Sequence, residues 1–240
     1  MTIIDATGLD FQTLNERINS TTGACTVANC CGQRFLGAGM ADREITVQGV
    51  PGNALGAFLN GASIHVDGNA QDAVGDTMNA GRIAISGSVG DAVGYAMRGG
   101  KIFVRGDAGY RAGIHMKAYQ DKVPVMVIGG CAGSFLGEYQ AGGVIIVLGL
   151  DRTDQPIVRY FPCTGMHGGA LYLRGSIEGV RFPPQVSARP AEPGDLAAIR
   201  PSLEEFCALF GCDLDALLAE PFTVVTPDTS NPFRQLYVAN

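Results

Sequence analysis

The sequence predicts an all-β fold: a right-handed parallel β-helix, built as a single-stranded solenoid of about seven coils of ~19 residues each. Three observations predict it. Glycine is unusually frequent, with 34 in 240 residues, about twice the usual ~7%. These glycines recur at a fixed spacing, and alternating apolar residues precede them. Because 46% of the residues are apolar and only 17% charged, the glycines belong to a globular chain and not to a disordered linker.

The repeat is visible as rows of residues that step by 19. Two of the rows are glycine: Gly49, Gly68, Gly87 and Gly106, and then Gly56, Gly75, Gly94 and Gly113. An apolar row with the same step is Leu59, Met78, Met97 and Met116. After a five-residue insertion around Tyr119–Val123 the glycines resume at Gly130, Gly133, Gly137 and Gly149. Self-similarity at a fixed period indicates a repeat architecture.

Each unit contains a short strand. Apolar residues alternate in the stretches 45–47, 64–66, 83–85 and 102–104, and a period of two predicts a strand with one buried face. A unit of this length is too short for a pair of helices, so it fits one coil, with successive coils stacked about 4.8 Å apart. Glycine is then needed where a corner requires positive φ, or where stacked backbones leave no room for a Cβ.

The two ends of the chain differ from the repeat. Residues 1–36 are expected to form a mixed N-terminal cap with a short amphipathic helix at 9–19, and residues 37–175 the β-helix itself. Residues 176–240 are expected to form an extended strap and helical tail, packed on the β-helix or on a partner. A terminal coil needs such a cover, because its open strand edge would otherwise promote aggregation.

Within the C-terminal segment, five prolines in residues 181–201 predict an extended strap. Helices are expected at 201–210 and 213–220. Ser202 is the expected N-cap of the first, with Glu205 three residues later, and Gly211 its expected C-cap. The last stretch, 222–238, is expected to lie back on the body.

The strands at 125–128 and 144–148 are apolar on both faces, which indicates burial on both sides. Earlier coils carry polar or small residues at the outward positions. The outer face near residues 125–148 is therefore covered, either by the C-terminal tail or by a partner subunit.

Four segments share the pattern G-x-x-G-x-x-x-G: 49–56, 87–94, 106–113 and 130–137. With the stretches 135–149 and 165–169, they resemble the GXGXG domain at the C-terminal end of the glutamate synthase large subunit. The same domain family includes the C subunit of formylmethanofuran dehydrogenase. Two positions depart from the pattern, since Gln71 replaces a second glycine and Cys163 a third. The motif glycines are Gly49, Gly52, Gly56, Gly68, Gly75, Gly87, Gly90, Gly94, Gly106, Gly109, Gly113, Gly130, Gly133, Gly137 and Gly149.

The resemblance implies a stand-alone, non-catalytic subunit that assembles a glutamate synthase-type complex for glutamate biosynthesis and ammonia assimilation. Its partners would be an amidotransferase subunit and an FMN-binding synthase subunit, in a hetero-oligomer. FMN and the iron–sulfur cluster would belong to those partners, so no catalytic, cofactor or metal residue is expected in this chain. The equivalent subunit of N-methylglutamate synthase or of formylmethanofuran dehydrogenase is an alternative.

Composition narrows the other possibilities. The net charge of −6, with no basic run longer than two residues, argues against nucleic acid as a partner. There is no apolar run long enough to span a membrane, and the N-terminal residues do not resemble a signal peptide. An odd count of seven cysteines argues against a disulfide framework, so a cytoplasmic location is expected. A free-standing carbohydrate-binding or carbohydrate-cleaving β-helix is a different possibility, but the chain has no tryptophan and no outward row of carboxylates.

One coil carries unusual residues. Arg111 stands in the row of Ala54, Ala73 and Ala92, and the insertion follows directly. His115 and Lys117 lie close to it in the chain. A bulky cation in place of alanine is costly in a repeat unless something binds there, so Arg111, His115 and Lys117 are the candidate partner interface. A solvated edge and an anionic ligand are the other interpretations.

The cysteine cluster and the aspartate row do not predict a metal-binding site. Cys25, Cys30 and Cys31 lack the spacing of a zinc or iron–sulfur site and are expected to be structural thiols. Asp72 and Asp91 share a row and are expected to cap turns.

Overall fold

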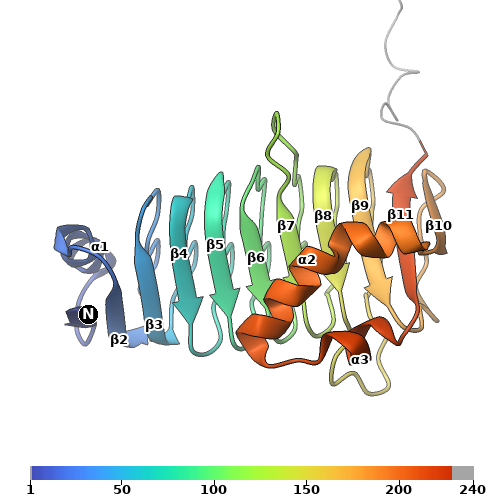
Figure 1. Cartoon of the computed structure of the whole chain (residues 1–240). Helices are drawn as coiled ribbons and strands as arrows, with labels where there is room; N and C mark the ends of the chain where they lie inside the picture. The colour runs from blue at the N-terminus through green and yellow to red at the C-terminus, as the bar shows by residue number, and fades with distance from the viewer. Residues whose placement is uncertain (1, 229–240) are drawn as a thin grey trace, which may run out of the picture.

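The protein is a β-solenoid in this computed structural model, which describes residues 2–228. Nine strands stack in parallel along one axis (Figure 1) and form a continuous sheet in chain order. They are β1 (Thr2–Asp5), β2 (Cys25–Cys31), β3 (Glu44–Val50), β4 (Asn60–Val66), β5 (Ala80–Ile85), β6 (Lys101–Val104), β7 (Val125–Ile128), β8 (Ala141–Val147) and β9 (Gly168–Arg174). The predicted parallel β-helix is confirmed. Its sheet begins at β1, so two strands of residues 2–31 belong to it as well.

The register of the strands explains the 19-residue period. Ile45 pairs with Ile64, Ile64 with Ile83, and Ile83 with Ile102, so identical positions of successive coils lie directly above one another. These side chains are buried and fill the interior, together with the row that holds Leu59, Met78, Met97 and Met116. Alternation along each strand therefore places one apolar row in the core at every coil.

Carboxylates and amides link successive corners. Asp72 Oδ1 accepts a hydrogen bond from the backbone N–H of Asp91 at 2.8 Å, and Asp91 Oδ1 accepts one from Tyr110 at 2.8 Å. The turn-capping role expected for Asp72 and Asp91 is confirmed. A Cβ on Gly90 would collide with Asp72 Oδ1, so this glycine makes room for the carboxylate of the preceding coil.

The N-terminal end is closed by α1 (Phe11–Ser20). Asp10 caps this helix by accepting a hydrogen bond from the Thr13 backbone N–H at 2.8 Å. Leu14 and Ile18 are fully buried in the same core as the strand residues. The amphipathic helix predicted at 9–19 is confirmed, with bounds shifted by two residues or fewer.

The tail contains a longer helix than the sequence suggested. The helix α2 spans Pro193–Phe210, so the strap expected to run to residue 201 was wrong from residue 193 on. Pro193 occupies the first turn, where a missing N–H costs nothing. Asp195 accepts hydrogen bonds from the Glu192 backbone N–H at 2.8 Å and from Arg189 at 2.6 Å. The Arg189 hydrogen bond, followed by that of Glu192, lowers the pKa of Asp195, so the carboxylate stays charged at the positive end of the helix dipole.

Ser202 is therefore a buried residue within α2 and not an N-cap. Pro201 also lies inside the helix, where it removes one backbone hydrogen bond. Because Pro201 is exposed, water can satisfy the carbonyl left without a partner. Packing on both sides of Pro201, by Ile199 and Leu203, holds the helix continuous. The helix ends at Gly211, whose φ of 70° is the left-handed C-cap expected there.

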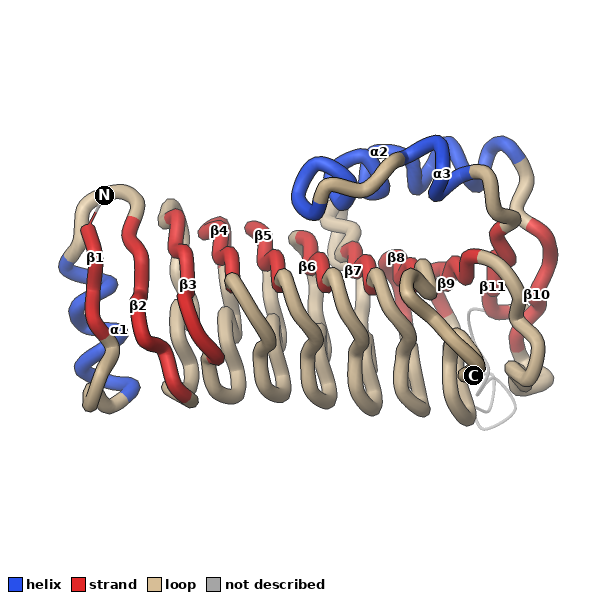
Figure 2. Tube along the Cα trace, turned by 90° about the horizontal axis from the view of Figure 1, so that it is seen from below, coloured by secondary structure: helices blue, strands red, loops and turns tan. Residues whose placement is uncertain are grey.

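The helix α2 and the short helix α3 (Leu214–Leu218) lie on the outer face of the last strands (Figures 1 and 2). Phe103, Val127 and Ile146 on that face are buried in a second apolar cluster. Its members from the tail are Ile199, Leu203, Phe206, Leu217, Phe222 and Val224. Of the two covers predicted for the apolar outer face, the structure shows that the tail supplies it.

Ion pairs also hold α2 on the sheet. Glu205 of α2 pairs with Lys101 on β6 at 2.5 Å and with Arg82 on β5 at 3.4 Å.

The tail also closes the end of the solenoid. The strand β11 (Phe222–Pro227) pairs antiparallel with β9, and β10 (Val186–Pro190) pairs antiparallel with β11. The open edge of β9 is thus covered by β11, a strand of the opposite direction, which the sequence pattern did not indicate. The expectation that the last stretch lies back on the body is confirmed to residue 228, and its remainder lies outside the described residues.

Candidate functional site

The turns of the coils have an unusual backbone that determines what they present. In the central coil Arg111, Gly113 and His115 have φ of 58°, 68° and 56°, the left-handed region that side chains seldom adopt. A Cβ on Gly113 would collide with the Ile145 side chain, so this middle position faces the core. The flanking positions are partly or fully exposed, since Arg111 is half-buried and His115 is exposed. Each central turn therefore exposes two side chains, at the two flanking positions, where the backbone has left-handed φ. Figure 2 shows these turns on the side of the strands away from α2.

Aromatic residues gather on the turns of the later coils in two rows along the solenoid axis. In one row the rings of Tyr110, Phe135 and Phe161 follow each other with centroids 5.3 and 5.2 Å apart. In the other, the His115 ring contacts Tyr95 at 5.9 Å and stacks on Tyr139 at 5.2 Å with an interplanar angle of 9°. We call this surface the aromatic patch and define it as Tyr95, Tyr110, Arg111, His115, Phe135, Tyr139, Tyr160 and Phe161.

Arg111 contacts two rings of the first row. Its guanidinium carbon is 4.8 Å from the centroid of the Tyr110 ring and 5.6 Å from that of Phe135. Its Nε is 2.8 Å from Oε2 of Glu138, a carboxylate with a side chain only 8% exposed. The cation is therefore neutralised inside the chain. The expectation that it is costly without a bound group was wrong, because the next coil supplies its counterion.

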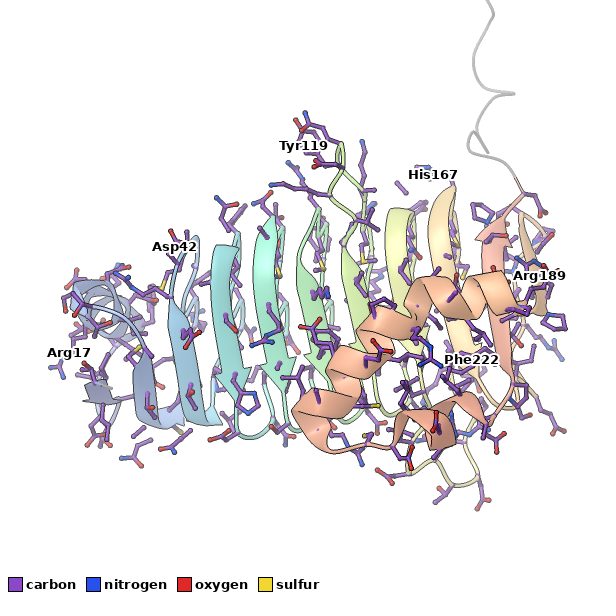
Figure 3. The ribbon with its side chains drawn as sticks, in the orientation of Figure 1. Arg17, Asp42, Tyr119, His167, Arg189 and Phe222 are labelled. Carbon is purple, nitrogen blue, oxygen red and sulfur yellow. The ribbon has the colours of Figure 1, made fainter. Side chains whose placement is uncertain are left out.

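The candidate residues Arg111 and His115 thus come together in the aromatic patch. Lys117 is exposed and lies two residues further on, at the start of the insertion. Residues 118–123 project from the body, with a bridge between Tyr119 and Lys122, and Tyr119 is at the tip in Figure 3.

A cleft adjoins the aromatic patch near the end of the solenoid. It has a volume of about 410 Å³ and is lined by Arg159, Tyr160, Phe161, Gly179 and Arg181. Tyr160 and Phe161 are 72% and 60% exposed, which is unusual for large aromatic side chains. No sequence pattern indicated this cleft, because its two sides come from segments before and after β9.

The thiols of the described residues lie mostly inside the solenoid. Among residues 2–228 there is no cluster of three His, Cys, Asp or Glu side chains that could hold a metal ion. Cys25, Cys30, Cys131 and Cys163 are buried, whereas Cys31 is exposed. Burial raises the pKa of Cys30 to about 11 and that of Cys163 to about 12. A high pKa keeps a thiol protonated, so these groups are poor nucleophiles at neutral pH.

We expect Cys31 to react with iodoacetamide at pH 8 at least about tenfold faster than Cys163, because Cys31 is exposed and Cys163 is both buried and protonated. Mass spectrometry of peptides from the folded protein measures both rates. The control is the protein unfolded in about 6 M guanidinium chloride. Both thiols are then accessible, so the difference between their labelling rates should disappear. Equal labelling of the two thiols in the folded protein would contradict the buried position of Cys163.

The geometry agrees with the comparison of this chain with known proteins. Residues 8–228 match the model of the family described as GXGXG motif. The chain belongs to the GXGXG motif family. The uncharacterized protein MJ1350 of Methanocaldococcus jannaschii is a relative, 44% identical over 249 residues. The alignment covers 98% of this chain and 95% of that protein.

The motif glycines of this GXGXG protein act in two ways. Gly56, Gly75 and Gly94 have φ of 63–67° and face the core at the middle position of their turns. Gly90 and Gly133 have no positive φ and instead leave space for the coil below. Cys163 takes the place of the third glycine in the last coil with a φ of 59°, so the left-handed turn is kept there without glycine.

The aromatic members of the patch were missed in the sequence. Phe135 and Phe161 occupy the same turn position as Arg111, as their backbone hydrogen bonds to the adjoining coils show. The insertions after Lys117 and Leu148 break the 19-residue step, so a fixed period does not align these rings. No helix among the described residues has both the length and the apolar character needed to cross a membrane.

Proposed function

We propose that this chain is a non-catalytic assembly subunit of a glutamate synthase-type complex. Its family membership over residues 8–228 is the observation that carries the proposal. The relative from Methanocaldococcus jannaschii is matched over 95% of its own length, so that protein has nearly the same extent as this chain. The partners are a glutamine amidotransferase subunit and a synthase subunit that holds FMN and the iron–sulfur cluster.

The architecture suits a spacer between two catalytic subunits. A single core runs from α1 to β9, and both ends are closed, by α1 and by the pair β10 and β11. Such a body transmits force between its ends with little bending, because every coil is hydrogen-bonded to the next. Held by it, the amidotransferase would release ammonia at a fixed position beside the synthase, where 2-iminoglutarate is reduced at the flavin.

The aromatic patch supports docking of a protein. Tyrosine, phenylalanine and arginine are enriched at protein interfaces. Several side chains of these types in the patch are exposed to solvent, as they would be in a subunit without its partner. It does not favour a carbohydrate site. His115 and Tyr139 stack on each other, so one face of each ring is already occupied. Glu138 is buried and paired with Arg111, which removes it as an acid or base.

Co-expression tests the proposal. The chain is given an affinity tag and is produced together with the amidotransferase and synthase subunits of the same organism. We expect the three to elute as one complex. Omitting this chain should lower the glutamine-dependent rate of glutamate formation about tenfold or more, since the ammonia is then no longer released at high local concentration. The rate with added ammonium should fall less.

Two results would contradict the proposal. One is elution of the chain alone while the other two subunits form an active enzyme without it. The other is equal loss of the glutamine-dependent and ammonium-dependent rates, since a spacer affects transfer between sites and not the reduction itself. Copurification from the native host with formylmethanofuran dehydrogenase subunits would support that alternative instead.

A further inference from the structure

The cleft at the end of the aromatic patch carries two arginines with no carboxylate partner among the described residues. Arg159 donates a hydrogen bond to Oε1 of Gln155 at 3.0 Å, an uncharged acceptor. Neither Arg159 nor Arg181 forms an ion pair within residues 2–228. In contrast, Arg82, Arg105 and Arg189 each pair with a carboxylate of this chain. Two cations placed at one cleft attract an anionic group.

The surroundings of these arginines are apolar. Tyr160 and Phe161 line the same cleft and are the most exposed rings of the aromatic patch. Phe161 continues the row of rings through Phe135, at 5.2 Å. A small inorganic anion would meet the guanidinium groups and leave these rings in water. The cleft therefore fits a larger partner that offers a carboxylate next to apolar side chains.

Charge complementarity also selects the partner. The whole chain has a net charge of −6, whereas this cleft is lined by Arg159 and Arg181 and by no carboxylate, so it is locally opposite in sign to the chain as a whole. The overall negative charge repels nucleic acid and anionic membranes at long range. An acidic segment of a protein is attracted by the cleft and has apolar groups for the rings.

We propose that the cleft and the aromatic patch receive an acidic segment of a partner subunit, with a carboxylate between Arg159 and Arg181 and an apolar side chain on Phe161. This inference rests on the proposed function, which supplies the partner subunits. The guanidinium groups bind the carboxylate by charge-assisted hydrogen bonds, and the ring surface around them excludes water.

The test uses the purified chain and the purified complex of the amidotransferase and synthase subunits. The double variant R159E/R181E is compared with wild type by isothermal titration calorimetry. We expect the Kd to rise about tenfold or more, because attraction becomes repulsion at the centre of the contact. Raising the salt concentration from 50 to 300 mM (about 14 to 6 Å in screening length) should weaken binding by wild type but not by the double variant.

Two further variants serve as controls. R17E makes the same kind of charge reversal on α1, at the opposite end of the solenoid in Figure 3, and should leave the Kd unchanged. Tyr160→Ala removes an exposed aromatic ring and leaves the net charge unchanged, and it should raise the Kd several-fold. Because Arg159, Tyr160 and Arg181 are all exposed, the thermal midpoints should stay near that of wild type.

The outcomes separate the two proposals. If wild type binds the other subunits and R159E/R181E binds them equally well, the cleft is not the docking site, while the assembly role stands. If wild type does not bind them at all, the assembly role is wrong and this inference with it. If the isolated chain forms a dimer that R159E/R181E abolishes, the occupant is a second copy, which overturns the proposed acidic partner.

Discussion

Replacing Phe206 by alanine is expected to lower the free energy of unfolding by about 3–5 kcal/mol. The Phe206 side chain is fully buried between α2 and the outer face of the sheet. Its ring packs edge-on against Phe210 with centroids 4.9 Å apart, and its tip lies above Gly129, at the end of β7. Truncation leaves a cavity that neither the sheet nor the helix can close, because ion pairs and apolar contacts hold α2 on both sides of it.

Urea unfolding followed by circular dichroism measures this loss. Glu204→Ala is the matched control in the same helix turn, since Glu204 is exposed and its only ion pair within residues 2–228 is with Arg200, one turn earlier. That variant should change the free energy by about 0.5 kcal/mol or less. A Phe206→Ala effect below about 1 kcal/mol would contradict the packing of the tail on the solenoid. Deleting residues 200–240 should cause aggregation, because it exposes the apolar outer face of β6 to β9.

Gly133→Ala is expected to cost about 3 kcal/mol or more, or to prevent folding. The Cβ of an alanine would lie 2.5 Å from the carbonyl oxygen of Gly109 and 2.6 Å from its carbonyl carbon. These are backbone atoms of the coil below, held by the hydrogen bonds that Gly133 itself donates to Ala108 and Gly109. Relief requires separating two coils and thus breaking the stack at that point.

The control for this substitution is Gly194→Ala. Gly194 lies in the first turn of α2, where a Cβ would have no atom within 4 Å and φ is not positive. Alanine there should be neutral or stabilising by up to about 1 kcal/mol, because it favours the helix. Thermal unfolding of both variants compares them directly. If Gly133→Ala is as stable as Gly194→Ala, close stacking does not explain the motif glycines.

Much of the solenoid could be predicted from the sequence, because its evidence is local and repeated. The step of 19 residues gave the coil length, and Ile45, Ile64, Ile83 and Ile102 gave the register that the strand pairing confirms. The motif glycines could be interpreted too, since both reasons for glycine, positive φ and close stacking, operate at single corners.

The candidate site was predicted only in part. Arg111 stood out because it interrupts a row of alanines, but its partner Glu138 lies in the next coil, across the insertion. The rings of Phe135 and Phe161 fall in the same row only when coils of different length are superposed. Their proximity depends on the positions at which the inserted residues loop out of the coils. The repeat alone does not specify these positions.

The tail shows a second limit of the repeat. Pro201 suggested a helix boundary, yet α2 passes through it, since Ile199 and Leu203 bury apolar surface on the sheet on either side. The loss of one hydrogen bond is smaller than the gain from that burial.

The sequence by itself thus determined a stacked, glycine-cornered β-helix, because each coil repeats the same short-range requirements of alternation and turn geometry. The tertiary structure alone decided that the tail covers the apolar outer face and closes the last strand, and that aromatic rings and arginines of different coils form one surface. Those contacts join residues far apart in the chain, and their geometry follows from packing between elements and not from any local pattern.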